Sequence, residues 1–161
     1  MKRTAPLAVV LGVLIDEDKL LVIKRDGGTY DGLMALPGGK VENDEHLPQA
    51  AIREIEEESG IQATYEEHLA TVSELLTDGE HTQHYLLHLI RLTPAMTNIL
   101  HTPEGDVTWE SLETIEEHQD LFVPSDWLFI EEIVKKGRRG YYECDLKKED
   151  DNYTLQRFEQ R

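Results

Sequence analysis

The spacing of hydrophobic and polar positions predicts a chain built mainly from strands. Residues 7–15 and 19–24 are almost continuously apolar, and the acidic turn Asp16-Glu17-Asp18 separates them. Such short apolar runs are typical of strands that are buried on both faces of a sheet. Two further strand-like runs, 63–76 and 82–92, are joined by a turn at Asp78-Gly79.

A helix is predicted for residues 48–59. Leu47, Ala51 and Ile55 recur every fourth residue and would form one apolar stripe. Pro48 suits the first position of a helix, and Gly60 suits the left-handed position that follows its end.

The last third of the chain predicts shorter elements. Residues 106–110 read as a short strand, residues 126–136 as a helix capped by Ser125, and residues 141–146 as a late strand. The polar stretch 147–161 is expected to be a mobile C-terminal tail. Strands mixed with two helices, without a repeat or a linker, indicate the α/β class and one domain over residues 1–161.

Charge narrows the range of partners. The chain has 161 residues, with 33 Asp and Glu against 16 Lys and Arg, which gives a net charge of −17. This balance argues against a nucleic-acid or membrane-surface binder, because both surfaces attract positive charge. The apolar run near the N-terminus is too short to span a bilayer. The single cysteine, Cys144, excludes an intrachain disulfide and suits the reducing cytoplasm.

Three acids of the first helix suggest a metal site. Glu54, Glu57 and Glu58 fall at i, i+3 and i+4 and would share one helix face. Crowded carboxylates repel one another unless a cation lies between them, and carboxylate oxygens select Mg²⁺, Mn²⁺ or Ca²⁺. Taken alone, the run Glu56-Glu57-Glu58 is more often a solvated helix face.

The neighbourhood of these acids resembles a known motif. Gly39 is followed at fixed spacings by Glu45, by Arg53-Glu54-Ile55, by Glu57-Glu58 and by Gly60-Ile61. These positions match the complete Nudix box, and the chain resembles the Nudix hydrolase family, most closely its MutT-like pyrophosphohydrolases. The resemblance implies an α/β/α sandwich with a mixed sheet, in which the box forms a loop–helix–loop metal site.

The resemblance also implies a role for each residue of the box. The Gly38 carbonyl, Glu57 and Glu58 would be Mg²⁺ ligands, with Mn²⁺ as a substitute. Glu54 would be a further ligand or the general base, and Arg53 and Glu45 would orient the acids. Family members often recruit an acid from a downstream loop. Glu104 is the candidate here, as an extra ligand or as the base, and its alternative is a solvated loop acid.

Substrate contacts are also suggested by the resemblance. Arg25 falls where MutT-like relatives place a basic residue against phosphate, although it could be an exposed strand end. Asp126 falls where an amide reads a purine edge in these relatives, and Trp127 could stack on a base. In the alternative reading, Asp126 only complements the helix dipole and Trp127 belongs to the core.

The resemblance implies a Mg²⁺-dependent, cytoplasmic enzyme that hydrolyses a nucleoside diphosphate linked to another group. A nucleoside triphosphate, including an oxidised purine nucleotide, is the favoured substrate, with a monophosphate and pyrophosphate as products. Nucleotide sugars and dinucleoside polyphosphates are alternative substrates, and a nucleotide sensor without activity is the alternative function. The expected partner is a small nucleotide rather than a nucleic acid or a membrane, and a homodimer is compatible with this reading.

Overall fold

The protein is built around a six-stranded mixed sheet. The computed structural model describes residues 4–161. The strands lie in the order β10-β9-β6-β7-β1-β5, in which β1–β7 and β6–β9 are parallel and the other pairs antiparallel. Their bounds are β1 Leu7–Val13, β5 Gly38–Lys40, β6 Ala63–Asp78, β7 His81–Pro94, β9 Gly140–Glu149 and β10 Asn152–Gln160.

A second, four-stranded sheet is centred on β3 (Lys19–Lys24), which pairs antiparallel with all its neighbours. These neighbours are β2 (Ile15–Asp16), β4 (Met34–Ala35) and β8 (Asp106–Ser111). The expected hairpin around residues 16–18 therefore forms, but through β2 and β3. The preceding strand β1 belongs to the large sheet.

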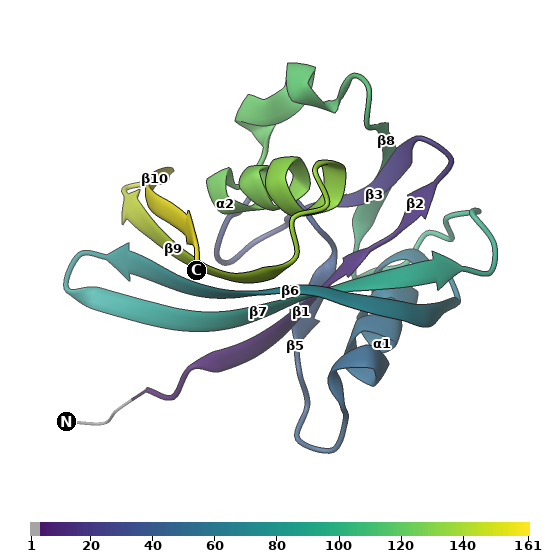
Figure 1. Ribbon diagram of the computed structural model, residues 1–161, viewed down its shortest axis with the longest axis horizontal. Helices are drawn as coiled ribbons and strands as arrows, with labels where there is room; N and C mark the ends of the chain where they lie inside the picture. Colours follow the sequence, from purple (N-terminus) through teal and green to yellow (C-terminus); the bar gives the residue numbers. More distant parts are fainter. Residues whose placement is uncertain (1–3) are drawn as a thin grey trace.

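Helices lie on both sides of the large sheet, as Figure 1 shows. The helix α1 (Leu47–Ser59) packs on one face, and Gly12 of β1 permits close contact, since a Cβ there would lie 2.7 Å from Ile55 Cδ1. On the other side lie α2 (Pro124–Leu128) and its π-helical continuation Phe129–Lys135, preceded by a 3₁₀ helix at Ile115–Leu121. The mixed α/β class is confirmed.

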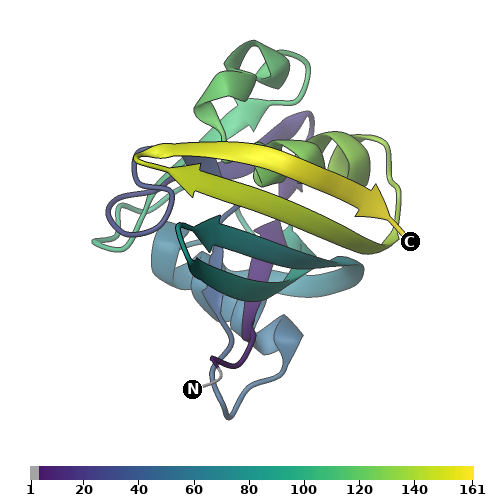
Figure 2. The same cartoon turned by 90° about the vertical axis from the view of Figure 1, so that its left-hand side faces the viewer.

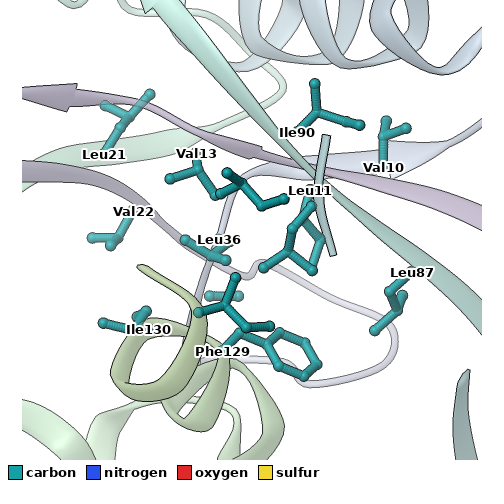
Figure 3. Close-up of a cluster of buried hydrophobic side chains, with 14 of the residues drawn as sticks. Val10, Leu11, Val13, Leu21, Val22, Leu36, Leu87, Ile90, Phe129 and Ile130 are labelled. Carbon is teal, nitrogen blue, oxygen red and sulfur yellow. The ribbon is translucent and has the colours of Figure 1, made fainter. Parts of the chain in front are cut away.

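The hydrophobic core fills the space between the sheets and the helices. Figure 3 shows Leu11 of β1, Val22 of β3 and Leu36 near Phe129 and Ile130 of the π-helical segment. Val10, Val22, Phe129 and Ile130 have no exposed surface. This core fixes α2 and the chain segment before the Pro37-Gly38-Gly39 turn relative to one another.

Two expectations about the C-terminal third are wrong. The stretch 147–161 is not a tail: its residues complete β9 and form β10, and Leu146 pairs with Leu155 across the hairpin. Ser125 does not cap the second helix, which begins one residue earlier at Pro124. Proline suits the first turn because its missing N–H would be unpaired there anyway.

Within residues 4–161, every helix is too short or too polar to cross a bilayer.

Candidate active site

The acidic helix face meets the glycine turn that leads into β5. A Cβ on Gly39 would lie 2.5 Å from Glu54 Cδ, so only glycine leaves room for this carboxylate. The backbone N–H of Gly38 donates a hydrogen bond of 3.1 Å to Glu58 Oε2. On the buried side of the helix, Ala51 and Ile55 are fully covered by the core. The stripe and the acids therefore occupy the two sides of α1 that the sequence predicts.

Arg53 ties the acids of this motif together. Its Nε and Nη2 donate to both carboxylate oxygens of Glu45, at 2.9 and 2.6 Å. Its Nη1 donates to Glu54 at 2.8 Å and to Glu57 at 3.1 Å, and Nη2 also reaches the Lys40 carbonyl at 3.1 Å. A planar guanidinium can make these contacts at once, and an ammonium cannot. Arg53 and Glu45 thus orient the other acids.

The acids differ in their electrostatic environment. Burial, with the nearby charges of Glu54 and Glu104, raises the pKa of Glu58 to about 8. Burial also raises the pKa of Glu54, although Arg53 opposes this shift. By contrast, hydrogen bonds from Arg53 lower the pKa of Glu45 to about 2. Two carboxyls of the helix face are therefore costly to ionise, and a bound cation would offset that cost.

The donor set suits a hard divalent ion, but the side chains do not yet enclose one. Among residues 4–161, no three His, Cys, Asp or Glu side chains form a group that could hold a metal ion. Glu57 instead turns toward Arg53, with a side chain that is 41% exposed. Glu58 and Glu54 contribute carboxylates with raised pKa values, and Gly38 and Gly39 bring the backbone close to both. The residues present fit such an ion in their chemistry.

Glu104 lies beside this helix, in the loop before β8. Thr102 Oγ1 donates to the Glu58 carbonyl at 3.1 Å, and a Cβ on Gly105 would lie 2.5 Å from the same oxygen. This loop closes a groove of about 500 Å³ that is lined by Arg25, Gly38, Glu58 and Glu104, among others. Glu104 therefore lies near the box acids, although it is 46 residues beyond Glu58 in the sequence.

Arg25 stands between this groove and a second cavity. The second cavity has a volume of about 410 Å³ and shares Arg25, Gly39 and Lys40 with the groove. The positive charge of Arg25 lowers the pKa of both Glu58 and Asp126, against the larger effect of burial on each. Within residues 4–161, Arg25 forms no ion pair with a carboxylate, which leaves its guanidinium available to an anionic ligand.

Of the two expected base contacts, the structure brings one to the cavity. Asp126 lines it and is 6% exposed, and its Oδ2 accepts a hydrogen bond of 2.8 Å from the Leu36 N–H. Burial is the main cause that raises the pKa of Asp126 to about 7. Trp127 lines neither cavity of the described chain, and its ring packs on Phe122 with centroids 5.9 Å apart.

A model of the NUDIX domain family matches residues 5–133, which is most of the chain. The protein belongs to the NUDIX family. Two curated relatives match shorter segments. An ADP-ribose pyrophosphatase of Methanocaldococcus jannaschii is 43% identical over 56 residues, which are 35% of this chain and 33% of that protein. A CTP pyrophosphohydrolase of Escherichia coli is 39% identical over 66 residues, 40% of this chain and 49% of that protein.

The matched segments thus span a third to a half of the length of these relatives. Solved structures cover more of the chain. A NUDIX hydrolase from Nitrosomonas europaea has a TM-score of 0.70 and 23% identity, over 91% of this chain and 82% of that chain. A mutator MutT protein from Bacillus halodurans has a TM-score of 0.70 and 21% identity, over 92% and 97%. The resemblance to the Nudix family and the fold that it implies are confirmed.

Several cavity residues of this NUDIX domain are absent from the sequence-based prediction. They are Tyr30, Lys40, Gln83, Tyr85 and, deepest of all, Glu74, which is 2% exposed. One signal could have identified Glu74. Ala70, Val72 and Leu76 alternate as buried residues of β6, and Glu74 occupies the inward position between the last two. An acid in such a position is unusual enough to mark a site.

Proposed function

We propose that the protein is a divalent-metal-dependent hydrolase of nucleoside diphosphates linked to another group, with nucleoside triphosphates as the favoured substrates. The observation that carries this proposal is the junction of the two cavities. An acidic groove and a cavity of base-like size share Arg25, Gly39 and Lys40. A ligand with a ring at one end and phosphates at the other would occupy both.

The groove would hold the metal. Glu54, Glu57, Glu58, Glu104 and the Gly38 carbonyl are the proposed ligands, with Mg²⁺ as the expected ion and Mn²⁺ as a substitute. When bound, the ion would offset phosphate charge and favour ionisation of the attacking water. Arg53 occupies one carboxylate oxygen of Glu54 and one of Glu57, and the second oxygen of each would be available to the ion.

The residues of the chain would supply the remaining functions. The Arg25 guanidinium would bind a phosphate oxygen at the junction, where it has no competing carboxylate. Either Glu54 or Glu104 would take the proton from the attacking water. A raised pKa brings Glu54 nearer to the range in which a carboxylate works as a general base. The water oxygen would form the new bond to phosphorus as a P–O bond of the bridge between the α- and β-phosphates breaks. The bridging oxygen would leave with the electron pair, and the products would be a monophosphate and pyrophosphate.

The nature of the curated relatives supports the reaction class. They are named for cleavage of ADP-ribose and of CTP, both of which contain the phosphoanhydride bond. The presence of all the box acids argues against a nucleotide sensor without activity. ADP-ribose, nucleotide sugars and dinucleoside polyphosphates remain alternative substrates of the same site.

A substrate panel tests the proposal. The protein is incubated with Mg²⁺ and nucleoside triphosphates, 8-oxo-guanine nucleotides, ADP-ribose, nucleotide sugars or dinucleoside polyphosphates, and the products are separated by chromatography. We expect turnover of at least one class and its loss on addition of EDTA. Binding of nucleotide without turnover of any compound would favour the sensor.

Replacing Glu57 tests the metal assignment. We expect Glu57→Gln to lower kcat at least ~100-fold, because a neutral amide is a poor ligand for a hard cation. Glu56→Gln is the matched control, since Glu56 is an exposed acid of the same helix. Near-normal activity of Glu57→Gln at low Mg²⁺ would contradict the role of Glu57 as a ligand.

A further inference from the structure

Two carboxylates from distant parts of the chain are buried at the same cavity. Glu74 of β6 is 2% exposed and Asp126 of α2 is 6% exposed, and both line the 410 Å³ cavity. One carboxylate oxygen of Asp126 accepts a hydrogen bond from the Leu36 N–H. Glu74 lies on a strand that contributes nothing to the Nudix box, and the proposed chemistry does not use it.

One oxygen of Glu74 is occupied and the other is free. Its Oε1 accepts a hydrogen bond of 2.9 Å from the Tyr30 hydroxyl. Its Oε2 is buried and has no hydrogen-bond partner among residues 4–161. Burial raises the pKa of the Glu74 carboxyl, and the Ser125 hydroxyl, which has no hydrogen-bond partner among residues 4–161, lies close enough to oppose that rise. A buried carboxylate oxygen without a donor is destabilising, so a donor on a molecule that enters the cavity would stabilise it.

The other residues that line the cavity indicate which kind of molecule would bind there. Val9, Leu11 and Leu87 present apolar surface, and Tyr85 presents an aromatic ring. These surfaces suit a flat heteroaromatic ring. Arg25 lines both this cavity and the acidic groove. The molecule would therefore have phosphates at one end, near Arg25, and at the other end a ring with a hydrogen-bond donor that faces Glu74.

We propose that Glu74 is a specificity residue, which selects nucleobases that carry an exocyclic amino group and disfavours bases with a carbonyl in its place. The proposal rests on the proposed function. An amino group would donate to Glu74 Oε2, with Asp126 as a second acceptor. A carbonyl oxygen at the same position would face the carboxylate oxygen, and two acceptors without a proton between them repel.

Two tyrosines hold Glu74 in this orientation. Tyr30 lies in the loop between β3 and β4 with a φ of 65°, a left-handed conformation that is uncommon for a tyrosine. Its backbone N–H donates a hydrogen bond of 3.0 Å to the Tyr153 hydroxyl of β10, and the two ring centroids are 4.6 Å apart. Tyr153 lies on β10, which pairs with β9 in the C-terminal hairpin drawn in yellow and yellow-green in Figure 2. Tyr30 and Tyr153 are positioning residues for Glu74.

Matched substrates that differ in one amino group test the proposal. CTP and UTP form one pair, ATP and ITP form a second for the 6-amino group, and GTP and XTP form a third for the 2-amino group. The measured quantity is the ratio of kcat/KM within each pair, at pH 8.5. This pH lies above the pKa of Asp126, which burial raises to about 7.

For the unmodified protein we expect the amino-bearing member to be preferred roughly 10- to 100-fold in at least one pair. Glu74→Gln should reduce that ratio to within about threefold, because an amide offers a donor as well as an acceptor. Glu80→Gln, an exposed acid in the β6–β7 turn, is the matched control and should keep the ratio. Equal use of both members of every pair by the unmodified protein would overturn the proposal.

A second variant covers the case in which Glu74→Gln fails to fold. Tyr153→Phe keeps Glu74 but removes the acceptor for the Tyr30 N–H, so the ratio should fall while the EDTA sensitivity is unchanged. An unchanged ratio in a folded Glu74→Gln protein would refute the role of Glu74, and an unchanged ratio in Tyr153→Phe would refute the positioning role of Tyr153. If no compound is cleaved, the proposed function fails, and the dissociation constants of the same pairs still test the selectivity.

Discussion

Asp126 provides a test of the electrostatics inside the cavity that does not depend on substrate. Its carboxyl is almost fully buried, and its Oδ2 accepts the Leu36 N–H at 2.8 Å. Burial and the nearby charge of Glu74 raise its pKa to about 7, against the opposing effects of the Leu36 hydrogen bond and Arg25. In the unfolded chain the pKa of an aspartate is about 3.9.

The sign of the pH dependence follows from these two values. Below about pH 4 the carboxyl is protonated in both states and has no effect on the free energy of unfolding. From there to pH 7 the unfolded chain loses the proton while the folded protein keeps it, so stability falls as the pH rises. Three pH units at about 1.36 kcal/mol each give a loss of about 4 kcal/mol, which is complete above pH 7.

Asp126→Asn removes this titration and keeps an oxygen for the Leu36 N–H. We expect the variant to gain stability relative to the unmodified protein as the pH rises from 4.5 to 8, by about 3 kcal/mol. Urea unfolding, followed by tryptophan fluorescence at each pH, measures the difference. Asp120→Asn, the same substitution at an exposed aspartate, should show almost no such trend. A stability difference for Asp126→Asn that is independent of pH would refute the raised pKa.

Two substitutions probe the box helix. Gly60→Ala should lower the free energy of unfolding by about 1–2 kcal/mol or more, because Gly60 has a φ of 73° and a Cβ there would lie 2.6 Å from Leu100 Cβ. Thermal unfolding measures this loss, and a melting temperature equal to that of the unmodified protein would contradict it. Arg53→Lys should lower kcat about 10- to 100-fold, because an ammonium cannot hold Glu45, Glu54 and Glu57 together. A proportionate loss of thermal stability would instead indicate a purely structural role for Arg53.

The parts of the fold that could be predicted are those in which the local pattern and the final environment agree. The apolar stripe of α1 lies where Ala51 and Ile55 predict, and Gly60 ends that helix in the left-handed conformation. The box acids and Glu104 meet in one region because the motif defines a local loop and helix, to which the loop before β8 is attached through Thr102.

The remaining features depend on partners that the local sequence does not specify. The segment around Tyr153 and Leu155 is polar and reads as a tail, yet it forms β10 because β9 offers it a hydrogen-bonding edge. Glu74 is an acid among the buried apolar residues of β6, so the local pattern does not explain it. Its proposed role depends on Tyr30 and Asp126, which are distant in sequence. Trp127 could be read from the sequence either as a base contact or as a core residue, and in the described chain its ring packs on Phe122 rather than lining the cavity.

The β9–β10 hairpin lies beyond residues 5–133, the segment that the family model covers, and yet it shields a vulnerable part of the large sheet. Along Ala70–Asp78, β6 is bonded to β7 on one side and to β9 on the other. Without the hairpin, alternate residues of β6 along this stretch would present unpaired backbone groups at an open sheet edge. Such an edge is a template for pairing between chains. With the hairpin in place the sheet ends instead at β10, whose charged residues Arg157 and Glu159 disfavour such pairing.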